Sequence, residues 1–142
     1  MLGVCNMDLR KNFPRSPYDA MAGIVMLPRT LDKCRAYNAE TLGEYHYNCP
    51  LDKPMLAFLG VTAEGFAIKV RELVTDERIE LWVKEKLSVK SKEEIEKFNN
   101  QMRHSMPDDE GSKEWLESEK QKLGRNDYFS YFDNIDADEK RF

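Results

Sequence analysis

Histidine and cysteine are scarce in this chain, which has 2 His and 3 Cys among 142 residues. A closed zinc site draws about four ligands from such residues, so little material remains for a structural metal centre. Cys5, Cys34 and Cys49 are odd in number and far apart, which is typical of free thiols in a reducing compartment rather than of a disulfide framework. We therefore expect no metal site and a cytoplasmic protein.

A long hydrophobic run is also missing. The longest one extends from Ala20 to Leu27 and contains Gly23, whereas a membrane-spanning helix needs about 20 apolar residues. The first residues, MLGVCNMDLRK, contain no apolar stretch of the kind that an export signal requires. We expect the chain neither to cross a membrane nor to be exported.

An excess of positive charge is the third absence. Lys and Arg number 22 against 26 Asp and Glu, which gives a formal net charge of −4 at pH 7. A phosphate backbone or an anionic membrane surface would repel such a molecule, so we expect no nucleic acid and no membrane as partners. Charged residues are denser after Gly60, while most prolines and tyrosines come before it. A functional site is therefore expected in the first part of the chain.

Helical periodicity and helix-capping residues are what the sequence does contain. Apolar residues recur at spacings of three and four, and no segment shows the alternation of a β-strand. Predicted helices run from Pro28 to about Asn38, after Pro50, after Thr62, after Thr75, from the capping box of Ser91 and Glu94, from Ser112 to Gly124, and from Tyr128 to Arg141. The pattern predicts an all-α fold, a single compact domain of about six to eight short helices.

The predicted helix from Pro28 has a charged face. Arg29, Asp32 and Arg35 follow one another at intervals of three, so they can form a ladder of ion pairs. Guanidinium groups also suit carboxylate and phosphate ligands, and a loop with tyrosines and an asparagine follows. The candidate ligand-binding residues are Arg29, Asp32, Lys33, Arg35, Glu44, Tyr45, Tyr47, Asn48 and Asp52. The alternatives are a solvated face whose ion pairs contribute about 0–1 kcal/mol each, and tyrosines that only pack against the helices.

Cys49 and His46 are the candidate catalytic residues. With Pro50 at the first helical position, Cys49 would be the N-cap, where amide groups and the helix dipole favour a thiolate. Asp52 in the first turn would compete for the same amides, and its charge opposes a thiolate. His46 is the nearby base. The alternatives are a structural cysteine and a metal site with Glu44, which lacks a second cluster of ligands.

The last predicted helix has an aromatic side and an acidic side. One face carries Tyr128, Phe132 and Ile135. We expect these aromatic and apolar side chains to close the core. The acidic residues allow either a binding role or an amphipathic lid over a pocket. The glycine and the final glutamate of an EF-hand loop are absent, which excludes a calcium loop of that kind.

Five segments of the chain resemble, in order, one bacterial family. They are DLRKNFPRSP, LPRTLDKCRA, GEYHYNCPLD, FLG and YFDNIDADEKR, and they resemble the family catalogued as domain of unknown function 5069 from about Met7 to Arg141. The family has no assigned activity, so the resemblance implies no catalytic residue and no cofactor. It implies that residues 1–6 are a flexible, dispensable N-terminal extension and that the single domain comprises 7–142.

The leading functional hypothesis is a cytoplasmic binding module. A small anionic ligand or an acidic peptide would lie between the Arg29–Arg35 helix and the Glu44–Asp52 loop. The first alternative is a small enzyme that uses Cys49 as nucleophile or redox thiol with His46 as base. The second alternative is a protein-interaction or regulatory partner. The sequence indicates no cofactor and no oligomeric state.

Overall fold

The computed structural model describes residues 7–142, which form seven α-helices and one β-hairpin. The predicted extension of residues 1–6 lies outside the described residues. The elements are β1 (Ala20–Met21), β2 (Ile24–Val25), α1 (Leu27–Ala39), α2 (Asp52–Leu59), α3 (Ala63–Leu73), α4 (Asp76–Leu87), α5 (Lys92–Arg103), α6 (Glu110–Leu123) and α7 (Tyr131–Asp138). The predicted all-α class with six to eight short helices is confirmed, apart from the hairpin.

Three helices begin at the predicted capping residues. The hydroxyl groups of Thr62, Thr75 and Ser91 accept hydrogen bonds from backbone amides in the first turns of α3, α4 and α5. Ser91 and Glu94 complete a capping box, since the Glu94 carboxylate accepts a hydrogen bond from the Ser91 amide at 3.0 Å. These local signals place the helices correctly because each cap satisfies an amide that the helix itself leaves free.

Two predicted boundaries are wrong. Helix α6 begins at Glu110, because the Asp109 carboxylate accepts hydrogen bonds from the amide of Ser112 at 2.7 Å and from its hydroxyl at 3.0 Å. Ser112 is therefore capped and is not the cap. Helix α7 begins after its cap Ser130 and ends at Asp138, so it is shorter than predicted. Tyr128 lies before it, yet is buried.

The hairpin β1–β2 is the element that the sequence pattern did not predict. Its strands pair antiparallel with Met21 opposite Ile24, and the two loop residues, Ala22 and Gly23, both have positive φ angles. The side chain of Asn99 in α5 binds the turn and β2, since it donates a hydrogen bond to the Gly23 carbonyl and accepts one from the Val25 amide. Strands of two residues are too short to show alternation, and the hairpin depends on this distant asparagine.

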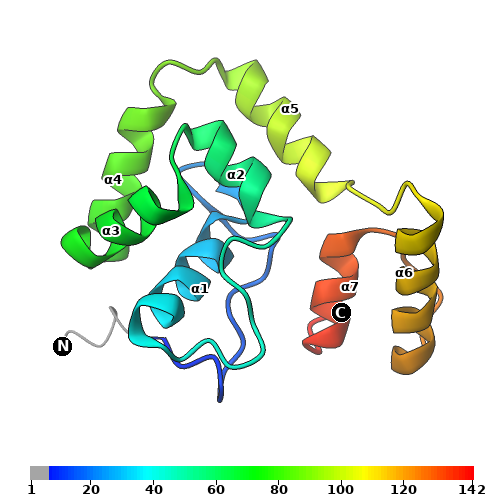
Figure 1. Ribbon diagram of the computed structural model, residues 1–142. Helices are drawn as coiled ribbons and strands as arrows, with labels where there is room; N and C mark the ends of the chain where they lie inside the picture. The colour runs from blue at the N-terminus through cyan, green and yellow to red at the C-terminus, as the bar shows by residue number, and fades with distance from the viewer. Residues whose placement is uncertain (1–6) are drawn as a thin grey trace.

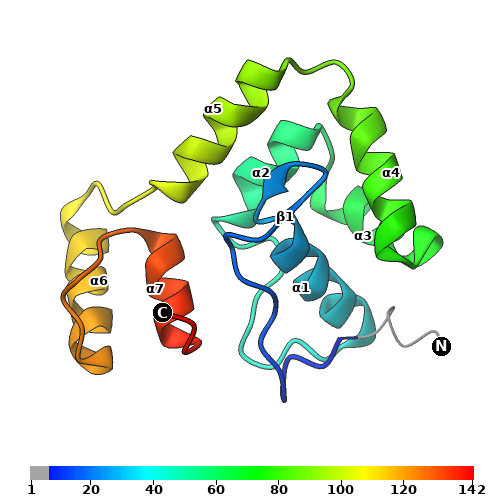
Figure 2. The ribbon, with the colours of Figure 1, turned by 180° about the vertical axis from the view of Figure 1, so that it is seen from behind.

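Helix α1 lies in the middle of the molecule (Figures 1 and 2). Helices α3 and α4 lie to one side of it, α6 and α7 lie together on the other side, and α5 connects the two groups. The main core contains residues of the hairpin and of α1 to α5, and Phe132 joins α7 to it. A smaller cluster of Leu116, Tyr128 and Ala137 holds α6 against α7. Within residues 7–142, no helix is both long enough and apolar enough to span a bilayer.

Candidate functional site

The charged face of α1 is buried. Arg29, Asp32, Lys33 and Arg35 are 4%, 1%, 3% and 4% exposed. The interpretation of this face as a solvated surface is therefore wrong, and so is the predicted ladder of ion pairs along the helix. Each side chain instead forms an ion pair with a different segment of the chain, because charges removed from water need a partner.

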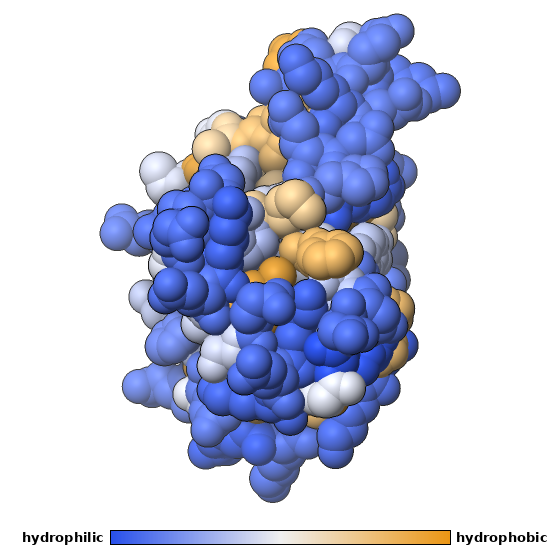
Figure 3. Space-filling view, turned by 90° about the vertical axis from the view of Figure 1, so that its right-hand side faces the viewer, coloured by the Kyte–Doolittle hydropathy of each residue, from blue (hydrophilic) through white to orange (hydrophobic). Residues whose placement is uncertain are grey.

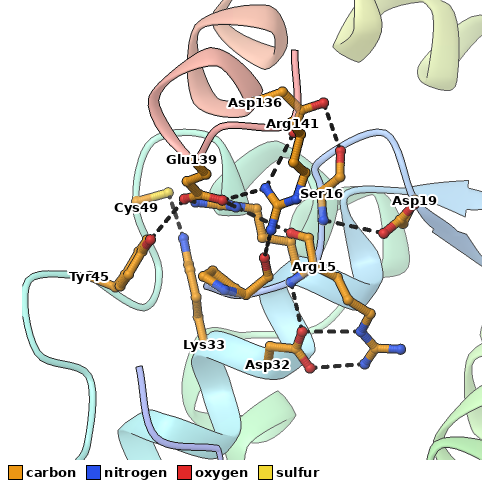
Figure 4. Close-up of polar contacts among 12 residues, drawn as sticks. Arg15, Ser16, Asp19, Asp32, Lys33, Tyr45, Cys49, Asp136, Glu139 and Arg141 are labelled. Carbon is orange, nitrogen blue, oxygen red and sulfur yellow. Dashed lines mark hydrogen bonds and ion pairs between the residues drawn. The ribbon is translucent and has the colours of Figure 1, made fainter. Parts of the chain in front are cut away.

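Arg29 pairs with Glu139, just after α7. Its two terminal nitrogens donate hydrogen bonds of 2.9 and 2.8 Å to the two carboxylate oxygens. Tyr45 donates a further hydrogen bond of 2.9 Å to Glu139, and Arg141 forms an ion pair with it. Burial favours a raised pKa for Glu139, but the bonds and charge of Arg29, with help from Arg141 and Tyr45, outweigh burial and lower that pKa. Figure 4 labels Tyr45, Glu139 and Arg141, which meet beside α1.

Lys33 pairs with Asp52, which is 0% exposed. The Asp52 carboxylate lies 2.9 Å from Lys33 Nζ and accepts a hydrogen bond of 2.6 Å from Thr30 and bonds of 3.0 Å from the amides of Asn48 and Cys49. Asp52 thus binds amides of the loop before α2, and α2 begins only at Asp52 with Leu51 as its N-cap. The prediction of Cys49 as N-cap is wrong, because the helix begins later than a first helical position at Pro50 requires.

A continuous chain of charges connects Asp32, Arg15, Asp76 and Arg35. Arg15 donates hydrogen bonds to both oxygens of Asp32 and one of 3.0 Å to Asp76. Arg35 Nη1 lies 2.7 Å from the other oxygen of Asp76, in an ion pair that lacks hydrogen-bond geometry. Arg35 Nε has no hydrogen-bond partner among the described residues. Burial favours a raised pKa for Asp76, but Arg35 and Arg15 outweigh it and lower that pKa.

This chain of charges lines an open cleft of about 570 Å³. The cleft lies among the loop before the hairpin, α1, the start of α4 and the C-terminal segment. Its guanidinium groups belong to Arg15, Arg35 and Arg141, and its carboxylates belong to Asp19, Asp32, Asp76 and Glu77. Asp76 is 37% exposed, whereas Arg35 beside it is 5% exposed in its side chain.

The backbone beside this cleft is strained at Val74, which ends α3. Its φ of 66° and ψ of −62° are rare for any residue with a side chain, and rarer still for a β-branched one. Thr75 N–H donates a hydrogen bond of 2.7 Å to the Leu73 carbonyl, which closes a γ-turn. Arg35 donates a hydrogen bond of 2.8 Å to the Val74 carbonyl. One buried arginine therefore holds both the strained turn and Asp76, and such strain often occurs at functional sites.

The predicted ligand-binding residues are divided among several places. Asp32 and Arg35 line the first cleft, whereas Glu44 and Tyr45 line a second, larger one of about 850 Å³ with Arg10. Lys33, Asn48 and Asp52 belong to the buried cluster around Asp52. Arg29 is occupied by Glu139. The structure therefore does not bring the predicted set together in one cavity.

Neither Tyr47 nor His46 forms a side-chain hydrogen bond with Cys49 in the described structure. Tyr47 packs against Tyr37 and donates a hydrogen bond of 2.6 Å to the Ala63 carbonyl. His46 is exposed. The polar neighbour of Cys49 is Lys33, whose Nζ lies 3.1 Å from the Cys49 sulfur. Among residues 7–142, no three His, Cys, Asp or Glu side chains gather in a group that could hold a metal ion.

Sequence reasoning did not select the partners of the charged face of α1. These are Arg15, Thr30, Asp76, Glu139 and Arg141. Arg15, Thr30, Glu139 and Arg141 lie within the segments that carry the family resemblance, which is the one signal that points to them. Asp76 lies outside those segments and resembles any acidic residue in the first turn of a helix.

The α6 side of the molecule is mostly hydrophilic, with a small hydrophobic area near the middle of the view (Figure 3). Met106, Trp115 and Phe129 are exposed in this part of the chain, at 52%, 47% and 62%. A hollow of about 330 Å³ lined largely by apolar groups lies beside Met106, Leu116 and Phe129. These residues are the surface feature relevant to the alternative of a protein partner.

One family model matches the chain, over residues 11–141, and it is described as a domain of unknown function, DUF5069. The match includes every residue that forms an ion pair with the charged face of α1. It confirms the resemblance of the five sequence segments. No curated protein sequence matches the chain.

Proposed function

We propose that this chain, which belongs to the family of domain of unknown function 5069, binds a small ligand with one anionic group in the cleft beside Arg15 and Arg35. One observation carries the proposal. Two guanidinium groups in the wall of this cleft share a single carboxylate, Asp76, which is itself partly exposed.

The position of Asp76 is suited to exchange with a ligand. Arg35 is already buried and oriented by the Val74 carbonyl, so little order is lost when it binds a carboxylate or a phosphate. Its Nε has no acceptor, and its contact with Asp76 lacks hydrogen-bond geometry. An anionic ligand that enters between Arg15 and Arg35 can therefore form better hydrogen bonds than Asp76 does.

The other charges of the cleft restrict the size of the anion. Asp19 and Glu77 also line the cleft, and Asp32 is taken up by Arg15. Several carboxylates would repel an acidic peptide or a polyphosphate. A ligand with a single anionic group meets the two arginines with the least repulsion, so we favour it over the acidic peptide. The net negative charge favours a protein that binds neither nucleic acid nor an anionic membrane, and the scattered free cysteines favour the cytoplasm.

The proposal places Asp32 and Arg35 in the site and adds Arg15 and Asp76. It leaves out the other predicted residues, because they do not line this cleft; these are Arg29, Lys33, Glu44, Tyr45, Tyr47, Asn48 and Asp52. The ligand is thus placed on the side of α1 that faces the start of α4, rather than at the Glu44–Asp52 loop.

Thermal unfolding in the presence of small anions tests the proposal. Inorganic phosphate and, separately, acetate are added at constant ionic strength to the wild type, Asp76→Asn and Asp127→Asn. Because Asp76 competes with the ligand, the anion should raise the Tm of Asp76→Asn more than that of the wild type. Asp127 forms an exposed ion pair with Arg125, so Asp127→Asn is the matched control for the loss of one charge.

A second variant keeps the test decisive if Asp76→Asn does not fold. Glu77 is exposed at the rim of the cleft, so Glu77→Gln reduces the repulsion without removing a buried ion pair. It should also increase the rise of Tm with the added anion. An equal rise of Tm in the wild type, Asp127→Asn and the cleft variants would overturn the proposal.

A further inference from the structure

A thiol and an amine lie in contact between α1 and the loop before α2. The Cys49 sulfur is 3.1 Å from Lys33 Nζ, and the same amine is 2.9 Å from the Asp52 carboxylate. The side chain of Lys33 is 4% exposed and that of Asp52 is 0% exposed. Cys49 is only partly buried. The fold thus holds the sulfur of a partly buried cysteine against a fixed nitrogen (Figure 4).

A sulfur and a nitrogen can form a bond with each other. This geometry holds the two atoms at a distance from which such a reaction can start. Reacting atoms held about 3–3.5 Å apart gain a large advantage over the same groups free in solution. A lysine side chain is normally flexible, so it keeps such a contact only part of the time. Here burial and the ion pair with Asp52 hold the amine in place.

We propose that Cys49 and Lys33 are a modification site for a peroxide, at which oxidation joins the two side chains by a sulfur–nitrogen bond. The site is separate from the anion cleft, since neither residue lines it. The inference therefore does not depend on the proposed function.

The reaction has two balanced steps. In the first, the Cys49 sulfur attacks one oxygen of the peroxide, the oxygen–oxygen bond breaks, and the thiol proton leaves with the other oxygen as water. This oxidises the sulfur by two electrons to a sulfenic acid. With hydrogen peroxide as the oxidant, the oxygen atom retained on sulfur carries one hydrogen.

In the second step, the Lys33 ammonium gives one proton to Asp52, and the free amine attacks the sulfur. The sulfur–oxygen bond breaks, and the departing hydroxide takes a second proton from nitrogen and leaves as water. The product is a neutral S–NH link beside a protonated Asp52. Relative to the reduced protein, the three side chains of Cys49, Lys33 and Asp52 have together lost two hydrogen atoms.

Asp52 explains why the modification would matter for the fold. In the reduced protein its carboxylate accepts hydrogen bonds from Thr30 and from the amides of Asn48 and Cys49. Protonation weakens these bonds, because a charged acceptor binds more strongly than a neutral one. The new covalent link holds the loop to α1 in their place.

Cys34 provides an internal control. It is buried, and burial raises the pKa of its thiol to about 12, so it reacts slowly with peroxide. Cys5 is replaced by serine in all samples, which leaves Cys34 and Cys49 as the thiols. Any rapid reaction of the folded protein is then assigned to Cys49 by peptide mapping.

The experiment treats the folded Cys5→Ser protein with hydrogen peroxide and measures its intact mass and its tryptic peptides. We expect a loss of two hydrogen atoms per chain, a missed cleavage at Lys33, and a peptide with Lys33 linked to the peptide with Cys49. Dithiothreitol should restore the original mass. Oxygen adducts on Cys49 without the link, or no reaction of folded Cys49, would overturn the inference.

Lys33→Arg is the matched variant, because a guanidinium keeps the charge but is a poor nucleophile. In this variant Cys49 should gain oxygen and form no link. A link of Cys49 to any other residue would contradict the assignment of Lys33. If the variant does not fold, the peptide map of the Cys5→Ser protein alone still decides between the two results.

Discussion

Arg29 and Glu139 lie 110 residues apart in the sequence and form two hydrogen bonds, of 2.9 and 2.8 Å, with both side chains buried. The pair joins the C-terminal segment to the central helix. Arg141 extends this connection, because it forms an ion pair with Asp136 and donates a hydrogen bond to the Pro14 carbonyl. The segment around Pro14 and the C-terminal segment therefore meet on α1, next to the cleft that we propose as the binding site.

Glu139→Gln should lower the free energy of unfolding by about 3 kcal/mol, because it leaves the buried charge of Arg29 without its partner. Asp127→Asn breaks an exposed pair and should cost much less. Chemical denaturation of both variants measures the difference. Equal small losses would show that the buried pair contributes no more than an exposed one.

The Arg29–Glu139 pair should also make the free energy of unfolding depend on pH. Since the folded pKa of Glu139 is lowered from its ordinary value of 4.5, its contribution is complete above that pH and is lost as pH falls through the lowered pKa. The wild type and Glu139→Gln should therefore differ most at neutral pH and converge in acid. Taking the difference between them removes the contribution of other acids, such as Asp138. A difference that does not change between pH 7 and strong acid would contradict this explanation.

Val74→Gly should be tolerated far better than a valine-to-glycine change usually is. Glycine adopts a positive φ without strain, and relief of about 1–3 kcal/mol of strain offsets the lost side chain and the greater freedom of the unfolded chain. We expect a free energy of unfolding within about 1 kcal/mol of the wild type. Val83→Gly, in the buried face of α4, should cost about 3 kcal/mol or more. Equal losses in the two variants would show that Val74 is not strained.

Lys33 and Asp52 should be coupled strongly. Asp52→Asn leaves a buried ammonium without its counter-charge, which costs about 3–5 kcal/mol. Lys33→Met in the same protein removes that ammonium, so the double variant should be more stable than Asp52→Asn alone. A double-mutant cycle of unfolding free energies measures the coupling. Additive losses would mean that the two charges do not stabilise each other.

The helices are predictable from sequence because their signals are local. Thr62, Thr75 and Ser91 cap helices from positions at most a few residues away, and the apolar spacing follows from the helix period. The hairpin is not predictable in this way, because Asn99 holds it from 74 residues along the chain.

The candidate site is predictable only in part, for the same reason. The pattern of Arg29, Asp32, Lys33 and Arg35 correctly marks a helix with unusual charges. It does not show whether those charges face solvent or each other, because their partners lie in four other segments. Spacing along one helix predicts pairs within it, whereas burial selects partners across the fold.

The measurement that tests the binding site most directly is an NMR titration of the arginine Nε–H signals with inorganic phosphate. The signals of Arg15 and Arg35 are assigned by substitution of each arginine with lysine. We predict that both shift and reach saturation with one common Kd, while the signal of Arg125, which does not line the cleft, stays in place. Unchanged signals for Arg15 and Arg35, or equal and unsaturated shifts of all arginines, would contradict the proposed site.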